Sequence, residues 1–235
     1  MSKKIKRPVT AKEIMDEKLE DPEYAKWYEQ QIEELDQDEI DRTNTFKPLV
    51  YDLGRIGYPV ESIDDLLTTY APIPIEVVDL LFEYLEKIGD DYREEIARLI
   101  GGTKIKYDGK PLTELFDSDI SDGFRWAISN TISLTKPTGI EKWLKKTLLN
   151  SKYGSERQML CTAAARILPA EEAIKALLEI FDEMPGHAAD GLGRVGGKFE
   201  LQFLKKFNPE KYHTWVKRAI DSAIRKIEKR LEHKK

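Results

Sequence analysis

The sequence predicts an all-α protein in which pairs of helices stack side by side, preceded by a helical extension. Three observations support this prediction. From about residue 45, apolar residues recur at helical spacing in segments that glycine, proline and aspartate interrupt. A five-residue motif at 53–57 returns at 192–196. No segment alternates apolar and polar residues convincingly, and the short stretch 103–107 is interpreted as an extended loop.

The composition fits a globular chain without disulfides. Its 235 residues, of which 40% are hydrophobic and 34% charged, suffice for one large domain or two small ones. Cys161 is the only cysteine, and the N-terminus lacks the apolar segment of a secretory signal. No run reaches the roughly 18 apolar residues of a membrane span. We therefore expect a cytoplasmic protein that does not contact a membrane.

Two helices are expected near the N-terminus. Thr10 and Glu13 have the spacing of a capping box, and Asp21 precedes Pro22 as an N-cap precedes a proline in the first turn. Before Thr10, basic residues occur without an apolar pattern, as in a mobile segment. We predict a flexible basic tail over 1–9, helices over 11–19 and 22–42, and an acidic helical extension over 10–44.

Charge is distributed unevenly along the chain. Residues 10–44 contain thirteen acidic and four basic residues, a net charge of −9, whereas residues 198–235 carry a net charge of +7. These segments could attract each other, serve as two partner surfaces, or be solvated faces without a dedicated role. The extension also carries a narrow apolar stripe, which we expect to dock on the rest of the same chain. The stripe consists of Trp27, Tyr28, Ile32 and Leu35.

Residues 45–235 are predicted to form a repeat domain. The motif reads Leu-Gly-Arg-Ile-Gly at 53–57 and Leu-Gly-Arg-Val-Gly at 192–196. In both cases one apolar helix is expected to end at the motif, and a second to follow after a short turn. Degenerate copies of the same unit occur at 124–134 and 159–168.

The stretch from about 121 to 207 resembles the bacterial HEAT-like repeat family. Units of that family read as an alanine-rich helix ending in Leu-Gly-Arg-hydrophobic-Gly and then a leucine-rich helix, and residues 188–204 are the best copy. The units near 45–70 and 91–118 depart from this pattern through loop insertions and extra prolines. The resemblance implies a right-handed α-α solenoid of HEAT-like helical pairs over 45–235, a bacterial or phage source, and a role in binding a partner.

Arginines at one repeat position form the first candidate binding site. Arg55, Arg166 and Arg194 could line one edge of the stack, where they could grip carboxylates or phosphates. The same row could instead tie adjacent repeats together by pairing with acidic residues. The acidic residues considered for this pairing are Asp52, Glu172 and Asp190, and Asp190 is retained as a binding candidate.

A polar and aromatic cluster is the second candidate site. Arg125, Trp126 and Asn130 lie on one predicted helix, and the spacing of four places Trp126 and Asn130 on the same face. A binding contact here competes with a core tryptophan whose indole is satisfied. Lys198, at the start of the helix after the second motif, is a further binding candidate.

Other conspicuous residues favour structural roles. The glycines within 191–196 fit G-x-G-x-x-G, but a helical pattern precedes them instead of a strand, so we interpret them as a helix end that needs positive φ. His187, His213 and His233 have no neighbours at metal-ligand spacing, and Cys161 is expected to be buried in the repeat core. We therefore predict no catalytic residue, no metal site and no cofactor.

The predicted function is that of a non-enzymatic interaction protein. A curved solenoid would hold another protein on its concave face, lined by second helices of mixed charge, as an adapter or as a toxin-neutralising, immunity-like partner. The alternative is a nucleic-acid enzyme similar to the HEAT-like DNA glycosylases. The net charge of −5 disfavours nucleic acid as a partner, because only the segment from Lys198 onward is basic. We expect a monomer or a weak dimer.

Overall fold

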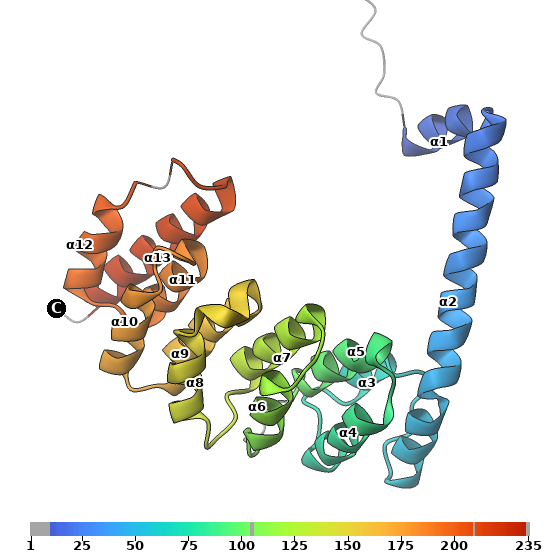
Figure 1. Cartoon of the computed structure of the whole chain (residues 1–235), viewed down its shortest axis with the longest axis horizontal. Coiled ribbons are helices and arrows are strands. Elements are labelled where there is room, and N and C mark those ends of the chain that lie inside the picture. Colours follow the sequence, from blue (N-terminus) through green and yellow to red (C-terminus); the bar gives the residue numbers. More distant parts are fainter. Residues whose placement is uncertain (1–9, 104–105, 209, 234–235) are drawn as a thin grey trace, which may run out of the picture. The chain divides into compact units, whose positions relative to one another are not determined.

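The computed structural model describes residues 10–103, 106–208 and 210–233. Every regular element in these residues is a helix, and the β-bridge that they contain, between Asp108 and Thr138, is isolated (Figure 1). The prediction of an all-α protein is therefore confirmed. No helix of the described part has both the length and the apolar character that crossing a membrane requires.

Two predicted segments fall wholly or partly outside the described residues. The tail over 1–9 lies outside them, as do residues 104–105 within the stretch 103–107. In the described part of that stretch, the carbonyl of Tyr107 accepts a hydrogen bond from the backbone N–H of Thr138 at 2.9 Å. This contact joins two loops, in agreement with the interpretation of the stretch as a loop.

The chain divides into two compact units, Met1–Pro48 and Leu49–Lys235. The first unit holds helix α1 (Ala11–Leu19) and most of α2 (Pro22–Arg55). The Thr10 hydroxyl accepts the backbone N–H of Glu13 at 3.2 Å, and the Glu13 carboxylate accepts the N–H of Thr10 at 2.9 Å. The Asp21 carboxylate accepts an N–H of the first turn of α2 at 2.9 Å. Both predicted helix starts are confirmed.

Helix α2 is longer than predicted, because it continues beyond residue 42 to Arg55. No glycine occurs in it before Gly54, and Pro48 is accommodated in its interior. Phe46, Leu49 and Leu53 are spaced by three and four residues, and all three are buried. Burial of this apolar face outweighs the cost of an internal proline, which is about 3 kcal/mol.

The second unit contains the end of α2 and a succession of shorter helices. Their starts follow the sequence: the Ser121 hydroxyl caps α7 by accepting the N–H of Phe124 at 3.2 Å, and proline occupies the first turn of α6 and of α11. The helices are α3 (Asp65–Thr69), α4 (Ile75–Lys87), α5 (Asp90–Ile100), α6 (Lys110–Asp117), α7 (Asp122–Thr135), α8 (Glu141–Leu148), the 3-10 helix η1 (Ser151–Arg157), α9 (Leu160–Ile167), α10 (Ala170–Glu179), α11 (Pro185–Val195), α12 (Lys198–Lys206) and α13 (Thr214–Glu232).

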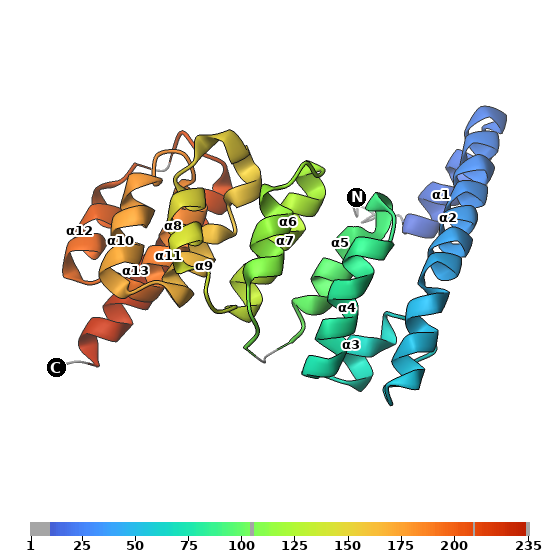
Figure 2. The same ribbon diagram turned by 60° about the horizontal axis from the view of Figure 1, so that its bottom comes forward.

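Two rows of helices run through the second unit (Figure 2). In the first row, α5, α7, α9, α11 and α13 each contact the next member. In the second row, α4, α6, α8, α10 and α12 each pack against the first-row helix that follows them in the chain. The helices therefore repeat as pairs, and each pair completes its core with its neighbours.

Small residues let the helices of the first row approach closely. A Cβ atom on Gly193 of α11 would lie 2.9 Å from the Cα atom of Ala223 on α13. Arg230 of α13 reaches the end of α11, where its guanidinium donates to the carbonyls of Gly193, at 3.0 Å, and Gly196. A cation placed at a helix C-terminus is electrostatically favourable, so this side chain caps α11 and joins it to α13.

Both copies of the five-residue motif end a helix, as predicted, but their glycines have different roles. In the first copy, Gly57 has a φ of +92°, and a Cβ on Gly54 would meet nothing within 4 Å. In the second copy, Gly196 has a φ of −63°, and a Cβ there would lie 2.7 Å from the carbonyl oxygen of Leu192. The positive φ expected for the glycines within 191–196 is therefore wrong: Gly57 of the first copy has it, whereas close packing requires glycine in the second copy.

Candidate functional site

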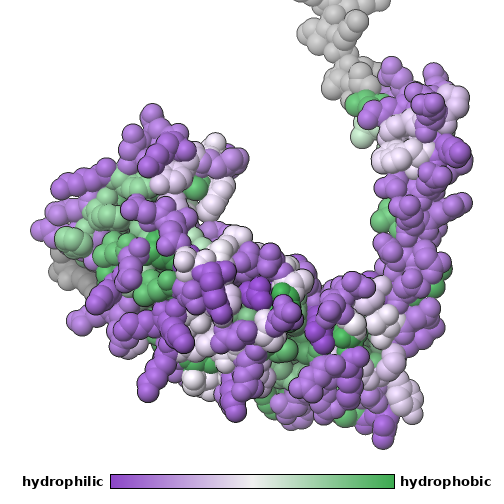
Figure 3. All heavy atoms as spheres, in the orientation of Figure 1, coloured by the Kyte–Doolittle hydropathy of each residue, from purple (hydrophilic) through white to green (hydrophobic). Residues whose placement is uncertain are grey.

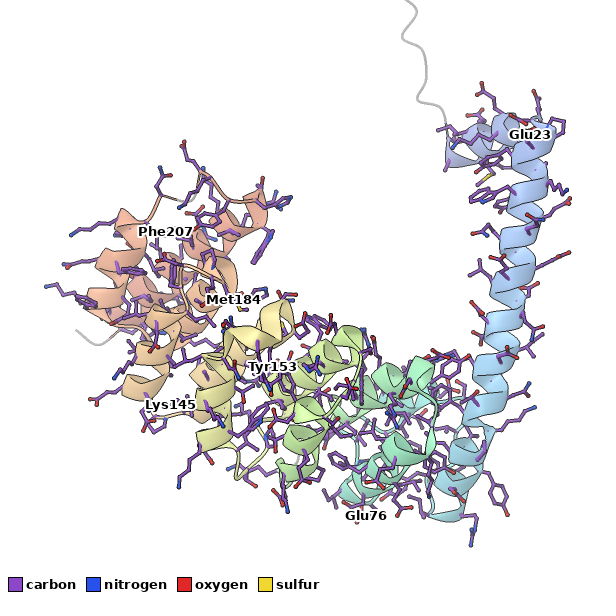
Figure 4. The ribbon with its side chains drawn as sticks, viewed as in Figure 1. Glu23, Glu76, Lys145, Tyr153, Met184 and Phe207 are labelled. Carbon is purple, nitrogen blue, oxygen red and sulfur yellow. The ribbon has the colours of Figure 1, made fainter. Side chains whose placement is uncertain are left out.

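A cavity of about 450 Å³ opens in the second unit, where the loop before α11 meets the start of α13. Residues of η1 form another wall, so segments far apart in the sequence surround it. Figure 4 shows Met184, which lines the cavity, between the η1 segment marked by Tyr153 and the end of α12 marked by Phe207. Charged, imidazole and aromatic side chains line the cavity, among them Arg157, Glu183, His187, Tyr212, His213 and Trp215.

Arg157 forms a buried part of the wall. The residue is 1% exposed, and its guanidinium donates to the carbonyls of Leu148, at 2.6 Å, and Gly154, at 3.2 Å, and to the Glu183 carboxylate. The Glu183 side chain is 54% exposed, so this ion pair presents its negative end to solvent. Gly154, with φ of +48°, turns η1 around the guanidinium through a conformation that suits glycine.

Trp215 supplies aromatic surface to the cavity. Its ring lies 5.1 Å from that of His187, centroid to centroid, and it covers Gly186 so closely that a Cβ there would come within 2.0 Å of the indole. Glycine is therefore required beneath the ring. Trp215 nevertheless remains 44% exposed, which leaves part of the indole accessible to a ligand.

The connection between α12 and α13 forms the rim of the cavity. His213 caps α13, since its Nδ1 accepts the backbone N–H of Trp215 at 3.5 Å. Tyr212 stacks on Phe207 with ring centroids 5.6 Å apart, and the Lys211 ammonium lies 5.2 Å from the Tyr212 centroid. These contacts fix the rings in place before any ligand arrives.

Burial lowers the pKa of His187 below its ordinary value, and the Asp190 carboxylate opposes this effect in part. Below about pH 6.5 the unfolded chain therefore takes up a proton at His187 more readily than the native protein does, and the stability due to neutral His187 is lost. We expect a His187→Gln variant to lose less free energy of unfolding than the natural chain between about pH 7 and pH 5. Urea unfolding followed by circular dichroism measures this difference, and parallel pH profiles would contradict the prediction.

Cys161 is buried in the repeat core, as predicted. Burial raises the pKa of its thiol to about 12, and the positive charge of Arg157 opposes this increase only in part. The thiol is therefore protonated at neutral pH. Its environment is that of a packing residue and not of a nucleophile.

A smaller hollow of about 220 Å³ lies near α8 and η1. Asp117 accepts hydrogen bonds there from the indole of Trp143, at 2.9 Å, and from the hydroxyl of Tyr153, at 2.6 Å. Burial and this bond to Asp117 raise the pKa of Tyr153. Both carboxylate oxygens are engaged, so Asp117 joins α6 to α8 and η1 instead of serving as a free base.

The structure brings two of the three arginines of the predicted row together. Arg166 of α9 and Arg194 of α11 lie on helices that contact each other. Burial lowers the pKa of Arg166, and the positive charge of Arg194 lowers it further. Arg166 of α9 also donates to the carbonyl of Ser133 on α7, a bond that ties neighbouring pairs. Arg55 pairs with Asp52 of its own helix at 3.7 Å.

The other acidic residues considered for the row pair with lysines. Glu172 accepts from Lys145 at 3.0 Å, and Asp190 accepts from Lys226 at 3.2 Å. Each pair links two helices, α8 to α10 in the first case and α11 to α13 in the second. In the described part of the chain, lysines pair with these two carboxylates, so the expectation that the arginines of the row pair with them is wrong.

Arg125 of the second candidate cluster has a structural environment. Its guanidinium donates to the carbonyls of Phe116, at 3.1 Å, and Ser118, at 3.0 Å, and so holds the end of α6 against α7. Trp126 is partly buried, with the Arg98 guanidinium 5.8 Å from its ring centroid. Asn130 is also partly buried, and Lys198 is exposed at the start of α12.

The cavity and the predicted binding residues do not coincide. The described lining includes none of Arg55, Arg125, Trp126, Asn130, Arg166, Asp190, Arg194 and Lys198. A signal for the cavity was nevertheless present in the sequence, because Tyr212, His213 and Trp215 form a dense aromatic group between two helical patterns. The spacing of the histidines was informative only about metal binding, and it does not predict this cavity.

Comparison of the chain with family models, with curated proteins and with solved structures gives no match. The resemblance to HEAT-like repeats therefore rests on the residues of the sequence. Among the described residues, no group of three or more histidine, cysteine, aspartate or glutamate side chains could hold a metal ion.

Proposed function

We propose that the chain is a non-enzymatic, cytoplasmic protein-interaction module, built as a right-handed solenoid of HEAT-like helical pairs. In this proposal the cavity beside α11 and α13 receives an apolar or aromatic side chain of another protein. The module would act as an adapter or as a toxin-neutralising partner. Docking would centre on this cavity, at one end of the row of helices.

The observation that carries the proposal is an accessible indole in a preformed hollow. Trp215 is fixed against Gly186 and His187 and keeps 44% of its surface exposed. Pockets of this kind accept the aromatic or aliphatic anchors that dominate protein interfaces, because a rigid wall loses little conformational entropy on binding. The neighbouring charge pair of Arg157 and Glu183 supplies a polar edge that could orient the partner.

A display selection on the full-length protein tests this proposal. Random peptides selected against the natural chain should share an apolar or aromatic anchor, and a Trp215→Ala variant should bind them at least about thirtyfold more weakly, the loss expected of an interface hot spot. Phe199→Ala is the matched control, since Phe199 is 68% exposed on α12 but does not line the described cavity. Fluorescence polarisation measures both affinities.

Two results would overturn the proposal. Peptides that bind both variants equally would show that the cavity does not anchor a partner. A salt-dependent shift of labelled duplex DNA at low ionic strength, weakened by Trp215→Ala, would favour the nucleic-acid enzyme instead.

A further inference from the structure

Two of the three histidines of the chain contact the tryptophan that lines the cavity. The His187 ring lies 5.1 Å from the Trp215 ring, centroid to centroid, and Nδ1 of His213 accepts the backbone N–H of Trp215 at 3.5 Å. His233, the third, is the C-cap residue of α13 and does not belong to the described lining. Histidine ordinarily changes its charge between pH 5 and pH 8, so protons can act directly on the wall of the cavity.

The two exposed tryptophans of the chain differ in their surroundings. Trp27, on the apolar stripe of α2, is 50% exposed, and Figure 3 shows the visible face of that segment as mainly hydrophilic with small hydrophobic areas. Neither described cavity includes a residue of the stripe, so its docking on the rest of the chain stays a prediction. Trp215, in contrast, lies in a cavity beside two imidazole rings, and binding to it can therefore depend on pH.

His187 is neutral at neutral pH while the cavity is empty. Burial lowers its pKa, and the Asp190 carboxylate of the same helix opposes this effect only in part. Asp190 is itself paired with Lys226 of α13 at 3.2 Å, and this pairing reduces the effect of its charge on the imidazole. A ring that loses more of its water becomes harder to protonate. An apolar or aromatic anchor that filled the cavity would therefore favour neutral His187 further.

The other groups around the cavity do not compensate a positive charge on His187. Arg157 and Glu183 pair with each other, so no carboxylate of the described lining is left unpaired. Near the rim, the Lys211 ammonium lies 5.2 Å from the centroid of the Tyr212 ring and adds positive charge. Helices α9 and α10 also pack against α11, but they contribute no residue to the described lining. Protonated His187 would thus need water, which an anchor in the cavity would exclude.

His213 links pH to the same tryptophan in a second way. Its Nδ1 can accept the backbone N–H of Trp215 only while that nitrogen carries no proton, because both ring nitrogens of a protonated imidazole are donors. Protonation therefore removes the cap at the start of α13. It also places a positive charge at the N-terminus of a helix, where the macrodipole disfavours it. Since Trp215 lies in the first turn of α13, acid weakens the support of the cavity wall.

We propose that the cavity binds its partner at neutral pH and releases it on acidification, through protonation of His187 and His213. This inference rests on the proposed function, because the bound anchor beside Trp215 is what the two histidines control. The anchor and the proton oppose each other, since the anchor excludes the water that charged His187 requires. The effect is reciprocal: the anchor lowers the affinity of the cavity for the proton by the factor by which the proton lowers its affinity for the anchor.

Fluorescence polarisation of a peptide at two pH values tests the proposal. The peptide is selected on the full-length protein, requires Trp215 for binding, has blocked ends and contains no histidine, aspartate or glutamate, so that it does not titrate itself. Between about pH 7.5 and about pH 5.5 its affinity for the natural chain should fall at least about threefold. Circular dichroism at both pH values checks that the fold is retained.

Histidine variants assign the effect. His187→Gln and His213→Asn should each reduce the loss of affinity, and the double variant should bind the peptide about equally at both pH values. Asparagine is chosen at 213 because it caps helices well at any of these pH values. His233→Gln is the matched control, since this histidine lies outside the described lining, and it should keep the profile of the natural chain.

Proton NMR of His187 gives an independent readout. Addition of the peptide should move the titration midpoint of its ring protons to lower pH, because the bound anchor disfavours the charged ring. A midpoint that stays in place or moves to higher pH would contradict the proposal.

The results distinguish this proposal from the proposed function. A peptide that requires Trp215 but binds equally well at both pH values would overturn the regulation alone. A pH dependence that survives in the double variant, or that accompanies loss of the helical signal at pH 5.5, would also overturn it. Selected peptides that bind the Trp215→Ala variant as tightly as the natural chain would remove both proposals, because no anchor in the cavity would be left to release.

Discussion

Replacing Arg157 by alanine is expected to lower the free energy of unfolding by about 3 kcal/mol or more. The residue is 1% exposed, and its guanidinium donates to two backbone carbonyls and one carboxylate. Alanine would leave the carbonyls of Leu148 and Gly154 without this donor and would open a void where the side chain lies. Urea unfolding followed by circular dichroism measures the loss.

Two further variants separate burial from charge in this prediction. Arg157→Lys keeps the charge but lacks the planar guanidinium that reaches three acceptors. This variant should therefore lose free energy of unfolding, but less than Arg157→Ala loses. Lys145→Ala removes the ion pair with Glu172, in which both side chains are about half exposed, and should cost less than about 1 kcal/mol. Equal losses for Arg157→Ala and Lys145→Ala would mean that water replaces the buried contacts of Arg157.

The local features of the fold could be predicted from the sequence because short-range chemistry determines them. The side chains of Thr10 and Glu13 each accept the backbone N–H of the other residue, and the Asp21 carboxylate accepts the backbone N–H of Glu23 at the start of α2. The apolar spacing of the second unit likewise specifies helices and their buried faces. The burial of Cys161 follows from its apolar neighbours in the alanine-rich segment.

Features that depend on contacts between distant segments could not be predicted in this way. The continuation of α2 beyond residue 42 depends on the burial of Phe46, Leu49 and Leu53, whereas Pro48 in the sequence favours a helix break there. The cavity is built from η1, the loop before α11 and the start of α13, and no periodicity relates these segments. The hydrogen bond from Arg166 to the carbonyl of Ser133 on α7 could not be predicted either, because the two residues are far apart in the sequence.

The two copies of the motif give a prediction of opposite sign at equivalent positions. Gly193→Ala should lower the free energy of unfolding by about 1 kcal/mol or more, because the new Cβ would lie 2.9 Å from the Cα atom of Ala223 and force α11 away from α13. Gly54→Ala should raise it by about 0.5–1 kcal/mol, since a Cβ there meets nothing within 4 Å and alanine favours the helix. Parallel urea unfolding of the two variants measures both changes.

A compensating substitution identifies the contact responsible. If the clash between α11 and α13 causes the loss, Ala223→Gly should remove part of it in the Gly193→Ala background, although Ala223→Gly alone destabilises α13 by about 1 kcal/mol. The free energy of unfolding of the double variant should therefore be higher than the sum of the two single changes predicts. Additive losses would place the cost of Gly193→Ala elsewhere, and a loss of stability in Gly54→Ala would show that the two copies have the same requirement for glycine. The comparison thus decides whether glycine is required for packing at position 193 and is dispensable at the equivalent position 54.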